Sequence, residues 1–260
     1  MFKRILSIIG LVAFILILTI FWNHLLGNLF SPFQVFRKTR WIFLVTFIIG
    51  MIVGVIGAII KNALQKRKNS QLLERHTIDS IMEHWGTGVG IIILTVSGFQ
   101  IHYHGGLPAI KLHFLGIFLT LLFGSYFIAD FFAFKKFRTL IPTMKDIIDG
   151  TIKKYLLRLK SKENGKYLSS QKSSFLIFVI LGALIFISGV IKLLFFYNVI
   201  SFRLLEIATK VHDISALLFG LVLVVHILLV IARRSNWPLL KSWFNGKTPE
   251  AHQPQKNNQS

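Results

Sequence analysis

The segment KVHDISALLFGLVLVVH, residues 210–226, has a histidine near each end and an almost entirely apolar run between them. A strongly polar side chain inside a membrane is costly, so an intramembrane ionisable residue indicates a functional site. His212 and His226 are fourteen residues apart, and at about 100° per residue they return to within about 40° of the same helix face. The helical rise separates them by about 21 Å along the axis. One helix face is therefore expected to present two imidazoles at two depths of a membrane.

The composition indicates an integral membrane protein. Of the 260 residues, 53% are hydrophobic, and thirty Lys and Arg outnumber ten Asp and Glu. The net charge of +20 would suit nucleic acid, but the basic residues lie mainly beside apolar runs, which is the positive-inside pattern of membrane proteins. The chain has no cysteine, which excludes disulfides, thiolate-ligated iron–sulfur clusters and covalently attached haem. Histidine is the only soft metal ligand present in quantity.

The hydropathy predicts an all-α integral membrane bundle. A spanning helix needs about 20 predominantly apolar residues. Six segments meet this condition: 5–23, 41–61, 83–102, 110–134, 173–197 and 208–232. The first segment could instead be an uncleaved signal anchor, although no small-residue cleavage site follows it. Trp22, Trp41, Trp85 and Trp237 lie near span ends and are predicted to be interfacial anchors.

The distribution of basic residues predicts that both termini are cytoplasmic. Lys and Arg are frequent in 61–75, in 135–172 and after residue 232, whereas 103–109 and 198–207 contain only Arg203. A cluster formed by Arg37, Lys38 and Arg40 would face outward in this orientation. The three other basic connections favour the orientation more strongly than this cluster opposes it. The stretch 138–171 mixes apolar and basic positions and is predicted to be an amphipathic helix on the cytoplasmic surface. Residues 251–260 are predicted to be a disordered tail.

Four of the nine histidines lie within predicted spans. With the orientation above, His113 and His212 fall in the outer layer of the membrane, and His84 and His226 fall in the inner layer. A single intramembrane histidine often only bonds a neighbouring helix. Two imidazoles facing each other across a bundle are what a bis-histidine b-type haem requires, so the pattern predicts two haems about 20 Å apart.

Small residues near these histidines would leave room for a flat macrocycle. They are Gly88, Gly116, Ala216 and Gly220. Two carboxylates, Glu83 and Asp213, adjoin proposed ligands, and one interpretation is that they transfer protons or orient a ligand's second nitrogen. The simpler interpretation, an interfacial carboxylate in water, is favoured for both.

The order of motifs resembles a known family. His84-Trp85 stands in one span, Leu112-His113 stands in the next, and GKYLSSQK (165–172) precedes a span with histidines fourteen residues apart. TVSGF (95–99) and SWFNGK (242–247) are smaller echoes. Over about residues 75–250 the chain resembles the dihaem cytochrome b (gamma) subunit of respiratory formate dehydrogenases. Cytochrome b subunits of thiosulfate reductase and of Ni,Fe-hydrogenase are relatives. Residues 1–74, with two further spans, have no counterpart in the family's four-helix haem-binding core.

The resemblance implies a place in a respiratory chain of the bacterial cytoplasmic (inner) membrane. Electrons would come from an iron–sulfur subunit beside a molybdenum or tungsten formate dehydrogenase-like subunit. They would pass through an outer haem, held by His113 and His212, and an inner haem, held by His84 and His226, to menaquinone. The quinone site would involve Tyr167, Gln171, Lys172 and His226. Leu168 stands where the family usually has an asparagine, which removes one hydrogen-bonding side chain from that site.

Two readings from other classes stay open. The histidines could relay protons or bind a metal ion in a transporter, which would require further acids within the spans and broken helices in related halves. The chain could also be a membrane anchor for an enzyme, without cofactors of its own.

Overall fold

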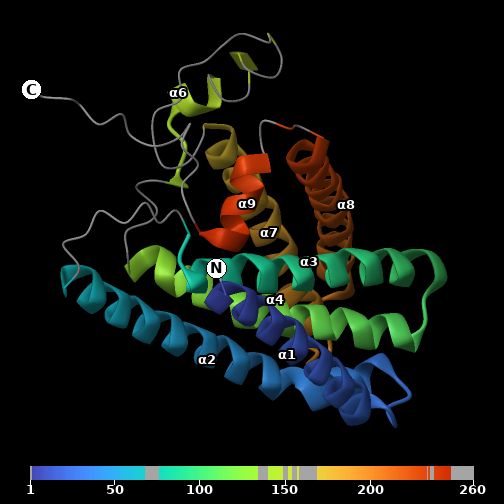
Figure 1. The fold of residues 1–260 in the computed structure, drawn as a ribbon. Helices are drawn as coiled ribbons and strands as arrows, with labels where there is room; N and C mark the ends of the chain where they lie inside the picture. Colours follow the sequence, from blue (N-terminus) through green and yellow to red (C-terminus); the bar gives the residue numbers. More distant parts are fainter. Residues whose placement is uncertain are drawn as a thin grey trace, which may run out of the picture. The chain divides into compact units, whose positions relative to one another are not determined.

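The computed structural model describes residues 2–67, 76–133, 140–148, 152–153, 157, 169–232, 234 and 237–246. The elements of this part of the chain are helices, and six of them are long and apolar enough to cross a membrane (Figure 1). They are α1 (Phe2–Leu26), α2 (Pro32–Arg67), α3 (Ile78–His104), α4 (Leu107–Ala133), α7 (Ser169–Phe195) and α8 (Phe202–Ala232). Two short helices, α6 (Met144–Ile147) and α9 (Trp237–Asn245), complete the set. The predicted all-α bundle with six spans is confirmed. The predicted tail 251–260 lies outside the described residues.

The helices extend beyond the predicted apolar runs, most of all α2. This helix begins at Pro32 and continues through the basic cluster Arg37, Lys38 and Arg40. Proline suits the first turn of a helix because its missing N–H is not needed there. The Ser31 hydroxyl accepts a hydrogen bond from the Gln34 N–H at 3.2 Å, as an N-cap does.

The chain divides into two compact units. The first contains residues 1–136 and 238–249, and the second contains residues 137–237 and 250–260. Helices α1, α2, α3, α4 and most of α9 thus belong to the first unit, and α6, α7 and α8 belong to the second.

Glycines allow α2 to approach α4 closely in the first unit. A Cβ atom on Gly54 would lie 2.7 Å from Ala129 Cβ and 2.8 Å from the Tyr126 carbonyl oxygen. A Cβ atom on Gly50 would collide with the Ser125 side chain. Helices in a membrane associate through such small residues because lipid tails are as apolar as leucine. Helices α2 and α3 therefore run along α4, one on either side (Figure 1).

The contact between α3 and α4 also depends on glycines that let the two helices approach closely. A Cβ atom on Gly90 would lie 2.6 Å from Thr120 Oγ1, and one on Gly116 would lie 2.8 Å from Leu94 Cγ. Gly116 was predicted to leave room for a macrocycle, and this prediction is wrong because a leucine of the neighbouring helix occupies the space. At Gly88 an added Cβ would meet nothing within 4 Å among the described atoms.

Helix α1 is fastened to the start of α4 by a buried tryptophan. Trp22 is only 2% exposed, its Nε1 donates to the Lys111 carbonyl at 3.0 Å, and its ring lies 5.7 Å from that of Phe118. The prediction that Trp22 anchors the membrane interface is therefore wrong. Trp41 and Trp237 are 63% and 47% exposed, which suits the predicted interfacial position.

Tight connections make α3–α4 and α7–α8 two helical hairpins. Gly105 and Gly106 adopt φ values of 64° and 99° between α3 and α4, a conformation that favours glycine. Asn198, with φ of 56°, lies between α7 and α8. Each hairpin carries two of the four intramembrane histidines.

The predicted amphipathic helix over 138–171 is wrong in its bounds. Helix α6 begins only after Thr143, whose hydroxyl accepts from the Asp146 N–H at 3.2 Å, and Ser169 already belongs to α7. A capping box starts a new helix at Thr143, since the Asp146 carboxylate also accepts from the Thr143 N–H. Much of the remaining stretch lies outside the described residues.

Candidate functional site

The structure distributes the four predicted ligands over both units. His84 lies near the start of α3 and His113 near the start of α4, in the first unit. His212 and His226 lie on α8, in the second unit. All four are within helices that can span a membrane, as predicted.

The ring of His113 is held by a buried serine of the preceding helix. Its Nδ1 lies 3.0 Å from the hydroxyl of Ser97, which is fully buried. The Ser97 hydroxyl also donates to the Ile93 carbonyl at 2.6 Å. Gly98 follows, and a Cβ atom there would lie 3.8 Å from His113 Cε1.

The ring of His212 has a matching environment in the other hairpin. Its Nδ1 lies 3.2 Å from the Ser188 hydroxyl and 3.1 Å from the Ile185 carbonyl. Ser188 is buried, and its hydroxyl donates to the Leu184 carbonyl at 2.6 Å. The orienting role considered for Asp213 is thus taken by a serine and a main-chain carbonyl of α7.

His84 and His226 have aromatic neighbours instead. The His84 ring stacks on Trp243 of α9 at a centroid distance of 4.1 Å, and Trp243 also stacks on His76 at 3.7 Å. The His226 ring meets Phe178 edge to face at 5.7 Å.

Glu83 is buried rather than in water, so the interpretation favoured for it from the sequence is wrong. Its side chain is 4% exposed, and its carboxylate lies in one group with those of Asp79 and Asp130. The three contribute oxygen atoms that all lie within 4.8 Å of one another. Three carboxylates at this spacing are able to share protons or a cation.

Of the predicted quinone residues, the structure describes only part. Tyr167 and Leu168 lie outside the described residues. The Lys172 ammonium lies 3.1 Å and 3.2 Å from the two carboxylate oxygens of Asp146. Gln171 stands beside it in the first turn of α7.

The Asp146 carboxylate, which lies outside the spanning helices, accepts hydrogen bonds from four side-chain and main-chain donors. Burial opposes its ionisation, but hydrogen bonds from the Thr143 main chain and hydroxyl, Lys172 and Ser169 outweigh burial. The pKa of Asp146 is consequently held well below its usual range. This ion pair ties α6 to α7 and gives Lys172 a structural partner.

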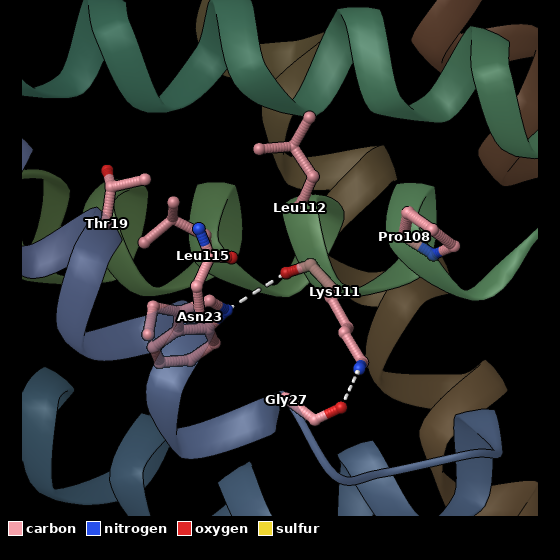
Figure 2. A pocket seen from close by; sticks show the side chains of 8 residues that line it. Thr19, Asn23, Gly27, Pro108, Lys111, Leu112 and Leu115 are labelled. Atoms are coloured by element: carbon pink, nitrogen blue, oxygen red, sulfur yellow. Dashed lines mark hydrogen bonds between the residues drawn. The ribbon is translucent and has the colours of Figure 1, made fainter.

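A hollow of about 450 Å³ lies between the end of α1 and the start of α4 (Figure 2). Residues of those two helices line it, among them Thr19, Asn23, Pro108 and Leu115. Lys111 reaches across its edge to donate to the Gly27 carbonyl at 3.2 Å. None of the four histidines lines this hollow, so it is separate from the predicted ligands.

The fold defines the chain as a multi-pass helical membrane protein with histidines set into its spans. Residues 75–246, more than half of the chain, match the family model of prokaryotic cytochrome b561. The chain belongs to this family. No match was found among curated proteins. Family membership makes it a membrane b-type cytochrome that binds b-type haem and transfers electrons.

The residues that sequence reasoning missed are the two serines. Both stand in Ser-Gly pairs in the second half of a span, at 97–98 and 188–189. This repeated Ser-Gly dipeptide is the feature of the sequence that could have indicated the two serines. Serine followed by glycine is common, however, so the dipeptide alone predicts little.

Proposed function

We propose that the protein is a dihaem b-type cytochrome subunit that carries electrons across the membrane from a partner iron–sulfur subunit to menaquinone. His113 and His212 would ligate the outer haem, and His84 and His226 the inner haem. The observation that carries the proposal is the matched setting of His113 and His212, each in a spanning helix and each held at Nδ1, within a chain of the cytochrome b561 family. A ring held at Nδ1 can offer Nε2 to a metal.

The residues present fit haem. The glycines beside His113 and His212 keep side chains away from the Cε1 edges of both rings. The absence of cysteine leaves non-covalent binding through imidazole as the available mode. Bound haem would supply reversible one-electron chemistry. The helices would contribute by fixing ligand orientation and by excluding water from the iron.

We place both termini in the cytoplasm of a bacterial cell, with the cytoplasmic (inner) membrane as the location. This orientation puts His84 and the Asp79–Glu83–Asp130 group on the cytoplasmic side. Intramembrane carboxylates commonly serve in proton relays. The group would take up the protons that quinone reduction consumes. Quinone binding would use Tyr167, Gln171 and His226, while Lys172 would act together with Asp146.

For the partner, the motif order favours a molybdenum or tungsten formate dehydrogenase-like catalytic subunit joined through an iron–sulfur subunit. A thiosulfate reductase or a Ni,Fe-hydrogenase is the alternative within the same class. Co-purification of the chain from its native membrane, followed by identification of the bound subunits, distinguishes them. A partner with neither an iron–sulfur cluster nor a redox metal would contradict this assignment.

The ligand assignment is tested by counting haems in purified variants. The wild type is expected to contain two b-type haems per chain. His113→Ala and His212→Ala should each remove the same haem and leave one, and His226→Ala should remove the other, as shown by reduced-minus-oxidised spectra. His104→Ala, at the exposed end of α3, is the matched control and should keep both. One haem or none in the wild type would refute the proposal.

A further inference from the structure

The two hairpins hold His113 and His212 with the same local arrangement. On α3 and on α7 a Ser-Gly pair faces the histidine of the following helix. Both serine hydroxyls donate at 2.6 Å to the carbonyl four residues earlier in their own helix. Both also lie within hydrogen-bond distance of an imidazole Nδ1. The same local arrangement of serine, glycine and histidine therefore occurs in both hairpins.

The direction of these hydrogen bonds follows from the number of protons. A serine hydroxyl has one proton, and in Ser97 and Ser188 it is donated to a main-chain carbonyl. Toward the imidazole the hydroxyl can only accept, so Nδ1 must be the protonated nitrogen. At His212 the Ile185 carbonyl, which can only accept, lies 3.1 Å from the same Nδ1 and requires the same tautomer. In both rings Nε2 therefore carries the lone pair.

We propose that Ser97 and Ser188 are positioning residues that hold His113 and His212 in the Nδ1–H form, so that the Nε2 of each ring is the haem ligand. This inference rests on the proposed function, since it concerns the haem assigned to those two histidines. Gly98 and Gly189 are part of this arrangement, because each lies beside the ring of the histidine. A Cβ atom on Gly189 would lie 3.4 Å from His212 Cε1, so a larger residue would press on the ring that Ser188 orients.

The second pair of histidines has ring contacts with aromatic side chains. His84 stacks on Trp243, and His226 meets the edge of Phe178. Because Ser97 and Ser188 contact His113 and His212, their effect should be confined to the haem assigned to those two histidines.

The expected consequence is a change in redox potential. An acceptor on Nδ1–H increases the basicity of a metal-ligating imidazole, which favours the oxidised iron. Removing the acceptor should make that haem easier to reduce and raise its midpoint potential. We expect the ratio of reduced to oxidised haem at fixed potential to rise several-fold for one serine. A tenfold change corresponds to about 59 mV for one electron.

The experiment is a potentiometric titration of the full chain in detergent, with electron paramagnetic resonance of the oxidised haems. Ser97→Ala should raise the potential of one haem and shift its g values. Ser188→Ala should raise the potential of the same haem by less, because the Ile185 carbonyl remains as an acceptor on His212 Nδ1. The double variant should raise it further than either single change. Ser97→Thr and Ser188→Thr keep a hydroxyl and should restore the wild-type signals. Thr95→Ala on α3 and Ser173→Ala on α7 are matched controls. Their hydroxyls also donate to the carbonyl four residues earlier, and they make no hydrogen bond to a histidine among the described residues.

The outcomes separate the two proposals. If the wild type holds no haem, or if His113→Ala and His212→Ala remove different haems, the proposed function fails. If those two variants remove one haem but the serine variants titrate like Thr95→Ala and Ser173→Ala, only the positioning role is overturned. A serine pair that shifts two different haems would likewise overturn it, because both residues would no longer act on one iron.

Discussion

The hairpin α3–α4 and the hairpin α7–α8 hold a histidine in the same way but are packed differently. In the first unit α4 lies between α3 and α2, and glycines bring all three backbones close together. In the second unit the two long helices contact each other and the short α6 braces the start of α7 through an ion pair. The contact between a serine hydroxyl and an imidazole therefore requires only the right register of two neighbouring helices. The surroundings of the two hairpins differ, whereas the contact between serine and imidazole is the same in both.

The largest expected effect would test whether close packing distinguishes the first unit. Gly54→Ala places a Cβ atom against the Tyr126 carbonyl and Ala129 Cβ, which cannot move aside easily. We expect the free energy of unfolding to fall by about 1–3 kcal/mol, the usual cost of overpacking. The measurement is denaturant unfolding in detergent micelles, followed by circular dichroism.

The matched control for that change is Gly182→Ala on α7. An added Cβ atom there would lie 3.8 Å from Phe219, which is an ordinary contact. Alanine also favours a helix over glycine by about 1 kcal/mol, so this variant should be as stable as the wild type or more so. Equal losses at both positions would abolish the contrast between the units.

A smaller effect concerns the fastening of α1 to α4. Trp22→Phe retains an aromatic ring beside Phe118 but loses the hydrogen bond to the Lys111 carbonyl. We expect a loss of about 1 kcal/mol in unfolding free energy, with the haem spectrum unchanged. Trp41→Phe, at an exposed site, is the control and should be neutral. A loss of haem in Trp22→Phe would show that α1 supports the cofactor sites directly.

The smallest effect is local to α6 and depends on pH. Because hydrogen bonds lower the pKa of Asp146 in the folded state, ionised Asp146 stabilises the contact between α6 and α7 above its unfolded pKa of about 3.9. This stabilisation should be lost as the pH falls from that value toward the folded pKa. The protection factor of the α6 amides, which is the intrinsic exchange rate at each pH divided by the observed rate, should therefore fall over this acidic range.

Two variants sharpen the pH measurement. In Asp146→Asn the α6 amides should be less protected from exchange already at neutral pH, and their protection should no longer depend on pH. Lys172→Ala removes one of the bonds that lower the folded pKa of Asp146, so its transition should end at a higher pH and have a smaller amplitude than in the wild type. If the protection factors of the α6 amides in the wild type are unchanged between neutral pH and pH 3, Asp146 does not stabilise the contact between α6 and α7.

Much of this architecture could be read from the chain. The six spans followed from apolar length, and the four histidines stood out because polar residues are rare in such segments. The role of Trp22 was misassigned because a tryptophan near a span end has the same local sequence whether it faces lipid headgroups or another helix. Glu83 was expected in water, since nothing near it in the sequence shows that Asp130, on the next helix, lies beside it.

The amino-acid sequence is enough to identify the segments that enter the membrane and the ionisable residues they carry, because a bilayer requires each spanning segment to satisfy its own backbone hydrogen bonds. The faces through which those helices meet become visible only in the folded chain. In lipid no hydrophobic gradient separates one side of an apolar helix from another, so packing of small residues and single polar contacts select the register. The pairing of Ser97 with His113 and of Ser188 with His212 arises from that selection, across sixteen and twenty-four residues of chain.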